Sequence, residues 1–365
     1  MLWRRMGSSV MLFGLLRRLS ALRLPLRLHS TPPADFSAAF SSPYHAPVLC
    51  QEVCEWLVTD PGGVYIDGTL GGGGHSAALL FMLSKAADAA ALKPKVLGID
   101  RDREAIATAS ERLQTYGESG MFEAVQRDFA RMADVVDKHS VSGILLDLGV
   151  SSRQIDDPGR GFSFAEERDG PLDMRMDATA GRRSAADLVN YASADELVRI
   201  LREYGEQPSA RRIVTAILKN RPIERTWQLA QVVERCVPFK ERQKASARVF
   251  QALRIAVNDE LGQLEQALLA AEKLLRPGGR LAIISYHSLE DRRVKRTFRN
   301  GALTNREPLK DIYGNVLSPW KPLGPRKPII ASEKEIEFNS RSRSARLRVA
   351  ERTGFGLAEE AAEES

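Results

Sequence analysis

Short apolar runs that end at a polar residue recur in the first half of the chain. They occupy residues 64–67, 95–100, 122–126 and 142–147. Three of them end in an acid, at Asp67, Asp100 and Asp147. Such runs predict buried strands, and the helical periodicity of residues 76–85 and 103–116 predicts helices between them. This alternation predicts an α/β fold with a mainly parallel sheet, in which ligands lie at the carboxyl ends of the strands.

The alternation stops after residue 152 and returns more than 120 residues later. Residues 156–182 are rich in Gly, Asp, Arg and Pro and predict a loop. Helical periodicity follows over residues 184–239, and residues 245–275 predict one or two long helices. A turn at 276–279 and a strand at 280–285 then resume the sheet.

We therefore predict one α/β domain in two parts with a helical segment inserted between them. The first part covers residues 44–155, the insertion residues 156–244, and the second part residues 245–352. Residues 353–365 are acidic at their end, with four glutamates, and predict a disordered tail.

The net charge of +6, from 53 basic and 47 acidic residues, comes from the first 34 residues. They contain six arginines and no acid, so the remainder is neutral and its overall charge identifies no partner. Two segments are nevertheless basic. Residues 199–254 hold 13 Lys/Arg against 5 Asp/Glu, and residues 286–352 hold 16 against 8. If their faces converge, they would bind RNA phosphates.

Residues 1–34 combine Arg, Leu and Ser in the manner of a mitochondrial transit peptide. A secretory signal is the alternative, but the apolar run here is short for one. This run, Val10–Leu16, has seven residues and is followed by Arg17. A membrane span needs about 20 apolar residues. We therefore expect import into the mitochondrial matrix, removal of residues 1–34, and no membrane partner.

The glycines of residues 67–76, Asp-Gly-Thr-Leu-Gly-Gly-Gly-Gly-His-Ser, allow a tight turn and close approach of the backbone to a ligand. Alone they indicate either a nucleotide-binding loop or a flexible turn. Asp100 follows roughly 30 residues later and could accept hydrogen bonds from a ribose cis-diol, which NAD and S-adenosylmethionine both carry. A solvated turn acid is the alternative.

Asp147 begins the third element, Asp-Leu-Gly-Val-Ser-Ser. An aromatic amine is a poor nucleophile unless acceptors bind its N–H groups and aim its lone pair. The Asp/Asn-Pro-Pro-aromatic motif of amino-methyltransferases is missing here, so Asp147 or the hydroxyls of Ser151 and Ser152 would replace it. The three cysteines, Cys50, Cys54 and Cys236, form neither a disulfide framework nor a zinc motif, and we predict no metal.

Several long motifs resemble the RsmH (MraW) family over residues 45–352. They are the glycine loop with His45-Ala-Pro-Val-Leu, Asp147-Leu-Gly-Val-Ser-Ser-Arg-Gln-Ile-Asp-Asp, Arg160-Gly-Phe-Ser-Phe, Pro171-Leu-Asp-Met-Arg-Met, Tyr204-Gly-Glu, Phe250-Gln-Ala-Leu-Arg-Ile-Ala-Val-Asn, Pro277-Gly-Gly-Arg, Ser285-Tyr-His-Ser-Leu-Glu-Asp and Asn339-Ser-Arg-Ser-Arg-Ser-Ala. This family methylates the 4-amino group of a cytosine in small-subunit ribosomal RNA with S-adenosylmethionine.

The resemblance implies a Rossmann-like class I methyltransferase fold and a set of cofactor contacts. These fall on Gly73, Gly74, His75, Asp100, Phe129, Asp147 and Gln154. Gly72 departs from relatives that often have Arg there. With the leader, the resemblance implies a mitochondrial member that modifies 12S rRNA, or a pre-ribosomal particle containing it, and supports mitoribosome assembly and translation. It assigns neither a catalytic residue nor an oligomeric state.

Other residues allow two interpretations. His287 could be a general base, but a structural or positioning role is favoured because water can take the product's proton. The arginines of residues 341–348 could bind phosphate or lie on a solvated strand edge, and Met174 and Met176 favour core packing. Covalent attack by Cys236 is not expected. Two other classes remain possible: a nicotinamide-dependent dehydrogenase, which would bind NADH, and a ribosome-assembly factor without activity, which would not methylate RNA.

Overall fold

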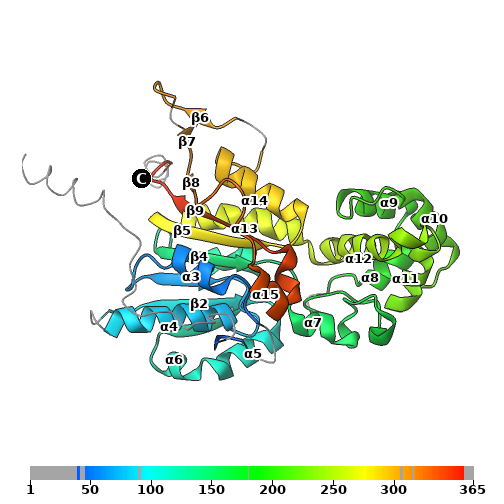
Figure 1. Cartoon of the computed structure of the whole chain (residues 1–365), viewed down its shortest axis with the longest axis horizontal. Coiled ribbons are helices and arrows are strands. Elements are labelled where there is room, and N and C mark those ends of the chain that lie inside the picture. The colour runs from blue at the N-terminus through cyan, green and yellow to red at the C-terminus, as the bar shows by residue number, and fades with distance from the viewer. Residues whose placement is uncertain are drawn as a thin grey trace, which may run out of the picture. The chain divides into compact units, whose positions relative to one another are not determined.

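The computed structural model describes residues 39–41, 46–88, 92–179, 181–304, 307–314 and 316–356 (Figure 1). The predicted leader, residues 1–34, and the tail from residue 357 lie outside the described residues. None of the described helices combines the length and the apolar character that crossing a membrane requires.

The sheet has seven strands, and its five consecutive strands β3, β2, β1, β4 and β5 are parallel. In order across the sheet the strands are β3 (Phe122–Gln126), β2 (Lys95–Asp100), β1 (Val64–Asp67), β4 (Val141–Asp147), β5 (Leu275–Ser285), β9 (Arg346–Arg352) and β8 (Trp320–Leu323). β9 lies between β5 and the edge strand β8 and is antiparallel to both. The predicted α/β fold with a mainly parallel sheet is confirmed. A separate two-stranded sheet pairs β6 (Leu309–Lys310) with β7 (Val316–Leu317).

Helices cover both faces of the sheet because the strands are buried on both sides. Ile66, Ile144 and Leu146 share a core with Leu264 and Leu268. These two leucines belong to α13 (Glu260–Leu274), which also packs on the short helix η1 (Phe129–Asp134). The other helices beside the sheet are α3 (Cys50–Leu57), α4 (Gly74–Asp88), α5 (Arg103–Arg112), α6 (Gln114–Glu118) and α14 (Ser288–Asn300).

Two elements differ from the sequence prediction in detail. The helix predicted over residues 103–116 is divided at Leu113 into α5 and α6. The turn predicted at residues 276–279 lies within β5, as an irregularity in its pairing with β4. Val141 faces Leu275 and Gly143 faces Arg280, so extra β5 residues bulge between these pairs, and Gly278 has φ 81° there.

The inserted segment has its own hydrophobic core. Its helices are α8 (Ala185–Tyr191), α9 (Ala194–Glu203), α10 (Ala210–Lys219), α11 (Thr226–Glu234) and α12 (Arg242–Asn258). Side chains from Phe162 to Val257 share this core, so α12 packs with the insertion beyond the boundary at residue 244 that we expected. Asn258 ends α12 and links it to the preceding loop. Its side chain donates to the Met174 carbonyl (2.8 Å) and accepts from the Met176 N–H (2.9 Å).

Candidate active site

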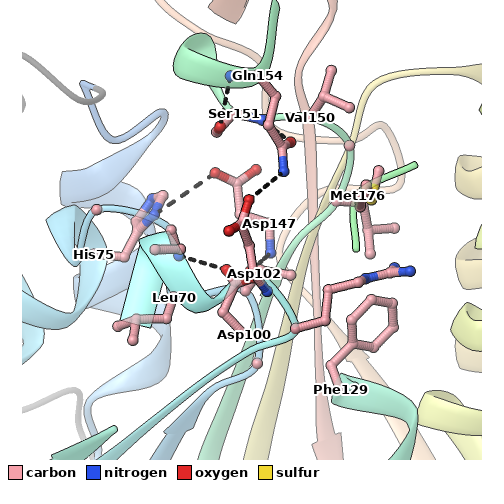
Figure 2. Close-up of a pocket in the computed structure, with 18 of the residues that line it drawn as sticks. Leu70, His75, Asp100, Asp102, Phe129, Asp147, Val150, Ser151, Gln154 and Met176 are labelled. Carbon is pink, nitrogen blue, oxygen red and sulfur yellow. Dashed lines mark hydrogen bonds and ion pairs between the residues drawn. The ribbon is translucent and has the colours of Figure 1, made fainter. Parts of the chain in front are cut away.

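A cavity opens at the carboxyl ends of β1, β2 and β4 (Figure 2). Six of the seven residues that we predicted as cofactor contacts line it, namely Gly74, His75, Asp100, Phe129, Asp147 and Gln154. The segments that supply them are far apart in sequence but meet here, because parallel strands place their carboxyl ends at the same edge of the sheet.

The glycine loop lines the cavity largely with backbone. The Gly71 N–H donates to Asp100 Oδ2 (2.9 Å), and Gly71 has φ 50°. Gly73, the seventh predicted residue, does not line the cavity. It has φ 74°, and a Cβ there would lie 3.2 Å from side-chain atoms of Ala109 and Leu113. Gly73 therefore lets the loop turn against α5, which differs from direct contact with a ligand.

Asp100 is held at the end of β2 by backbone N–H groups. Its Oδ2 accepts from Gly71, and its Oδ1 accepts from Asp102 (2.9 Å). Burial raises the pKa of Asp100 from 3.8 to about 6, although these N–H groups lower it. Each carboxylate oxygen keeps a second lone pair, so Asp100 can still accept hydrogen bonds from a ribose diol.

Asp102 organises the cavity wall next to Asp100. It accepts from the Glu104 N–H at the start of α5 (3.0 Å) and pairs with Arg160 (3.1 Å). The Gln154 side chain donates to the same carboxylate (3.3 Å), and Gln154 also forms a capping box with Ser151 at the start of α7 (Ser152–Asp156). Gln154 is thus fixed by both ends of its amide and orients the loop that follows β4.

Asp147 lies at the end of β4 and contacts three neighbouring segments. Its N–H donates to Thr69 Oγ1 (2.7 Å), and its Oδ1 accepts from the Tyr286 hydroxyl (2.8 Å). Its Oδ2 lies 3.8 Å from His75 Nδ1. Burial raises the pKa of Asp147 to about 6, while His75 and Tyr286 lower it. Burial and Asp147 raise the pKa of Tyr286 well above 10, so its hydroxyl keeps its proton and donates.

His75 stands in the first turn of α4 and is buried. Its Nε2 lies 2.9 Å from the Val48 carbonyl oxygen. That oxygen can only accept, so Nε2 carries the proton. Nδ1 then faces Asp147, and His75 connects the glycine loop with the end of β4.

Phe129 is the first residue of η1, separated from the end of β3 by two residues, and it lines the cavity (Figure 2). An aromatic wall at this place suits a flat heterocycle. Sequence reasoning missed Tyr286, Thr69 and Asp102, which also line the cavity. Tyr286 stands in a motif that we quoted, beside the histidine that drew attention. Met176 is buried as expected for core packing, but it lines the cavity as well.

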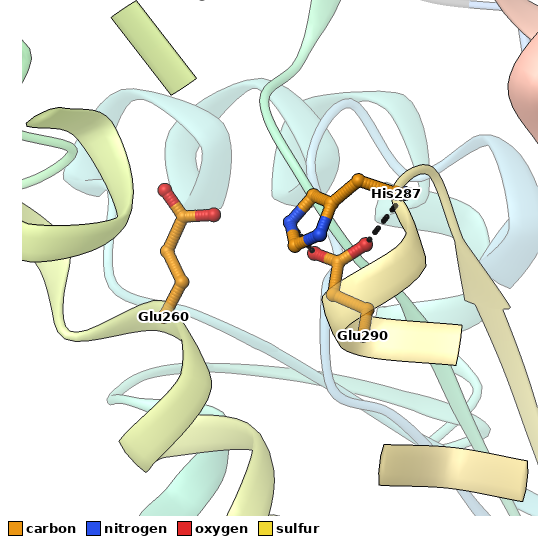
Figure 3. A group of neighbouring side chains, drawn as sticks. All are labelled: Glu260, His287 and Glu290. Carbon is orange, nitrogen blue, oxygen red and sulfur yellow. Dashed lines mark hydrogen bonds and ion pairs between the residues drawn. The ribbon is translucent and has the colours of Figure 1, made fainter. Parts of the chain in front are cut away.

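Glu260, His287 and Glu290 form the one group in the described part of the chain whose spacing could suit a metal ion (Figure 3). Both carboxylates already have partners. Glu260 accepts two hydrogen bonds from Arg254 (2.8 Å each). Glu290 Oε1 lies 3.1 Å from His287 Nε2, and its Oε2 accepts from the N–H groups of Tyr286 and His287. These contacts favour a positioning role for His287 at the start of α14.

The arginines of residues 341–348 are mostly engaged. Arg341 pairs with Asp156 (2.7 Å), and Arg348 pairs with Asp291 (2.6 Å), which also lies 3.8 Å from Arg346. These ion pairs argue against a free phosphate-binding run over this segment. The contacts of Arg346 and Arg348 with Asp291 also hold the start of β9 against α14.

The cavity fits S-adenosylmethionine. Its floor is backbone that a ligand can approach closely, Asp100 can accept from the ribose, and Phe129 provides an aromatic wall. The amino end of α4 can bind a carboxylate, and the acid Asp147 in the cavity wall suits a cationic ligand. With the sheet order, these features define an α/β methyltransferase that uses S-adenosylmethionine.

Comparison with known proteins identifies the family. Residues 42–353 match the MraW methylase family. "Ribosomal RNA small subunit methyltransferase H" of Geotalea uraniireducens is 46% identical over 321 residues, which are 85% of this chain and 98% of that protein. The protein of the same name from Citrifermentans bemidjiense is 48% identical with the same coverage. The chain belongs to the MraW methylase family.

Among solved structures, an rRNA methylase from Streptococcus thermophilus is similar over 83% of this chain and 93% of its own. At 13% identity and a TM-score of 0.34, this likeness adds nothing to the family assignment.

Proposed function

We propose that this protein methylates the 4-amino group of a cytidine in mitochondrial small-subunit (12S) rRNA. The family match and the relatives named for small-subunit rRNA support an RNA substrate. The observation that carries the amine chemistry is the Asp147 carboxylate, which is fixed by Tyr286 beside the glycine loop. It occupies the strand end where an amino-methyltransferase needs a hydrogen-bond acceptor.

The chemistry requires the protein to orient an amine rather than to activate it covalently. S-adenosylmethionine, when bound, supplies an electrophilic methyl group on its sulfonium. Asp147 accepts an N–H of the target amine, which directs the nitrogen lone pair away from the ring. Tyr286 and Thr69 keep the end of β4 in place, so this acceptor is oriented before the substrate arrives. The proton released from the methylated amine goes to water.

We assign cofactor binding to the cavity residues and to the turn that shapes it. Asp100 holds the ribose, Phe129 covers the adenine, and Gln154 orients the loop after β4. Gly74 and His75 place the start of α4 against the methionine moiety, with Asp147 near its amino group. Gly73 supports this arrangement through its backbone conformation.

The mitochondrial part of the proposal rests on residues 1–34, which have the composition of a transit peptide. After import into the matrix, the substrate would be 12S rRNA or a pre-ribosomal particle that contains it. Methylation there would support mitoribosome assembly and mitochondrial translation.

The decisive experiment maps N4-methylcytidine in mitochondrial small-subunit rRNA from cells with and without the protein. Loss of one modified cytidine, restored by the wild-type chain but not by Asp147→Asn, is expected. An unchanged modification pattern would contradict the proposal. A fusion of residues 1–34 to a fluorescent protein tests the compartment separately, because it should enter mitochondria. Purified protein should bind S-adenosylmethionine but not NADH, which separates a methyltransferase from a dehydrogenase, and should methylate RNA, unlike an inactive assembly factor.

A further inference from the structure

A second concavity, apart from the cofactor cavity, is lined by residues of α14 and of the strands β8 and β9. Figure 1 shows α14 beside these strands. Its rim is basic: Lys295 and Arg299 come from α14, and Arg326 and Lys327 come from the segment after β8. Its remaining lining is largely apolar and includes Phe298, Leu323, Leu347 and Val349. We refer to this feature as the α14–β9 cleft.

In the described part of the chain, the four rim cations lack acidic partners, unlike Arg292 and Arg293 of α14. Arg292 pairs with Glu206 (3.0 Å) and Arg293 with Glu265 (2.6 Å). Lys295, Arg299, Arg326 and Lys327 are exposed, and no acidic side chain within the described residues pairs with them. A single solvated cation is ordinary. Four of them around one apolar-lined cleft make a positive surface that attracts an anionic polymer.

The strand register shows which side of this cleft faces the catalytic edge, the edge of the sheet where the cofactor cavity opens. Ser285, at the carboxyl end of β5, faces Arg346 at the start of β9. Val349 of β9 then faces Leu323, at the carboxyl end of β8. Because β8 and β5 are both antiparallel to β9, their carboxyl ends point the same way. The segment after β8, with Arg326 and Lys327, therefore extends toward the catalytic edge. Lys295 and Arg299 lie on the half of α14 that runs back from that edge, because Phe298 packs on Trp320 at the start of β8 (ring centroids 5.7 Å apart).

We propose that the α14–β9 cleft binds the sugar–phosphate backbone of the RNA that flanks the target nucleotide. This inference rests on the proposed function. Lys and Arg on the rim contact phosphates, and the apolar floor accommodates the faces of bases or riboses. An acidic protein segment could also meet the cations. RNA is favoured because the side of the cleft that carries Arg326 and Lys327 faces the edge that a target base must reach, so a strand leaving the cavity can continue along the cleft.

Two double variants, K295A/R299A and R326A/K327A, test the cleft. The matched control is K93A/K273A, whose exposed lysines precede β2 and β5 at the opposite edge of the sheet. Binding of a labelled small-subunit rRNA fragment is measured by anisotropy from low to high salt. Each cleft variant should reduce the slope of log affinity against log salt by about 1.4 to 1.8, as expected for two lost phosphate contacts. The control should keep the wild-type slope, and all variants should bind S-adenosylmethionine equally by calorimetry.

A charge-preserving variant, R326K/K327R, separates charge from local structure and should retain the wild-type slope. If both cleft variants keep the wild-type slope while the wild-type protein methylates the fragment, the cleft does not bind RNA. This inference is then wrong, while the proposed function stands. Competition by polyglutamate at the cleft, with an unchanged RNA slope in the variants, would overturn it in favour of an acidic protein partner. If the wild-type protein neither binds nor methylates RNA, the proposed function itself is wrong.

Discussion

Asp100 is the single residue on which cofactor affinity should depend most. Asp100→Ala removes hydrogen bonds to the ribose, worth about 1.5–3 kcal/mol each when one partner is charged. It also removes the acceptor for the Gly71 and Asp102 N–H groups, which shape the loop. We expect at least a tenfold lower affinity for S-adenosylmethionine by calorimetry, with cooperative unfolding retained. Asp60→Ala, at an acid paired with Arg276 outside the cavity, is the control. Equal affinity in wild type and Asp100→Ala would remove Asp100 from the ribose site.

The same carboxylate predicts how cofactor binding depends on pH. Its pKa is about 6, and the ribose binds the ionised form. Below pH 6 a proton must leave before the cofactor binds, so the dissociation constant should rise up to about tenfold per pH unit for this one group. The stability of the fold should depend on pH in the opposite direction to cofactor affinity. The raised folded-state pKa of Asp100 stabilises the fold below about pH 4, and this stabilisation is lost as the pH rises through 6. Titrations at pH 5 to 8 test this. An Asp100→Asn protein should show a shallower acid limb that retains the contribution of Asp147, whose pKa is also about 6.

Asp147 tests whether a cofactor-binding residue also serves the nucleophile. Asp147→Asn nearly preserves shape but removes the charge and places a donor where an acceptor is needed. If the residue only binds cofactor, saturating S-adenosylmethionine should restore the rate. If it also positions the amine, the single-turnover rate with prebound RNA should stay at least tenfold lower at saturation. We expect the second result, and full recovery would leave Asp147 a binding residue only.

At the scale of elements, the start of α14 depends on Glu290. Burial tends to raise its pKa, but the hydrogen bond and charge of His287, together with Arg254, lower it below 4.5. Glu290→Gln weakens these contacts and the N-terminal capping box, and we expect a loss of about 1–3 kcal/mol of unfolding free energy at pH 7. A carboxyl group whose pKa is lowered by folding stabilises the folded protein at pH values above its unfolded-state pKa. This stabilisation is lost as the pH falls through the folded-state pKa. The difference between wild type and variant should therefore persist to about pH 4.5 and close below it.

Urea unfolding monitored by circular dichroism checks this, with the exposed Glu337→Gln of α15 (Glu333–Phe338) as the control. Equal stabilities of the two variants would show that Glu290 does not hold α14.

The elements that were predictable are those with a local signal. β1 to β4 are short apolar runs, three of which end in an acid, and their bounds were predicted within one residue. β8 was not predicted as a strand, because it contains Pro322, and β9 was considered only as a possible strand edge over residues 341–348. Their identity as strands depends on pairing with each other and with β5.

The cavity could also be predicted only where the signal is local. The Asp100 site follows from its strand, but the Tyr286–Asp147 contact joins residues 139 positions apart. Phe129 and Gln154 came from family resemblance alone.

For the whole molecule, RNA affinity should depend on the insertion as well as on the sheet. Arg211 and Arg212 are exposed on α10, and Arg212 lies with Lys219 and Arg235 around a basic depression. R211A/R212A should reduce the salt slope of RNA binding by about 1.4 to 1.8 without changing cofactor affinity. R341A/R343A should have a smaller effect, because Arg341 already pairs with Asp156. Salt titrations of both proteins decide, and an unchanged slope in R211A/R212A would mean that this face is only solvated.

The position of β9 also determines how the chain can be shortened. This strand is the last part of the sheet to be synthesised, yet it lies between β5 and β8 rather than at an edge. A premature stop before residue 346 would leave both neighbours with unpaired backbone N–H and C=O groups, which promote aggregation. It would also remove Arg348, the partner of Asp291 on α14. Nonsense or frameshift alleles late in the coding sequence should therefore yield an aggregated or degraded protein, whereas truncation after residue 356 should be tolerated.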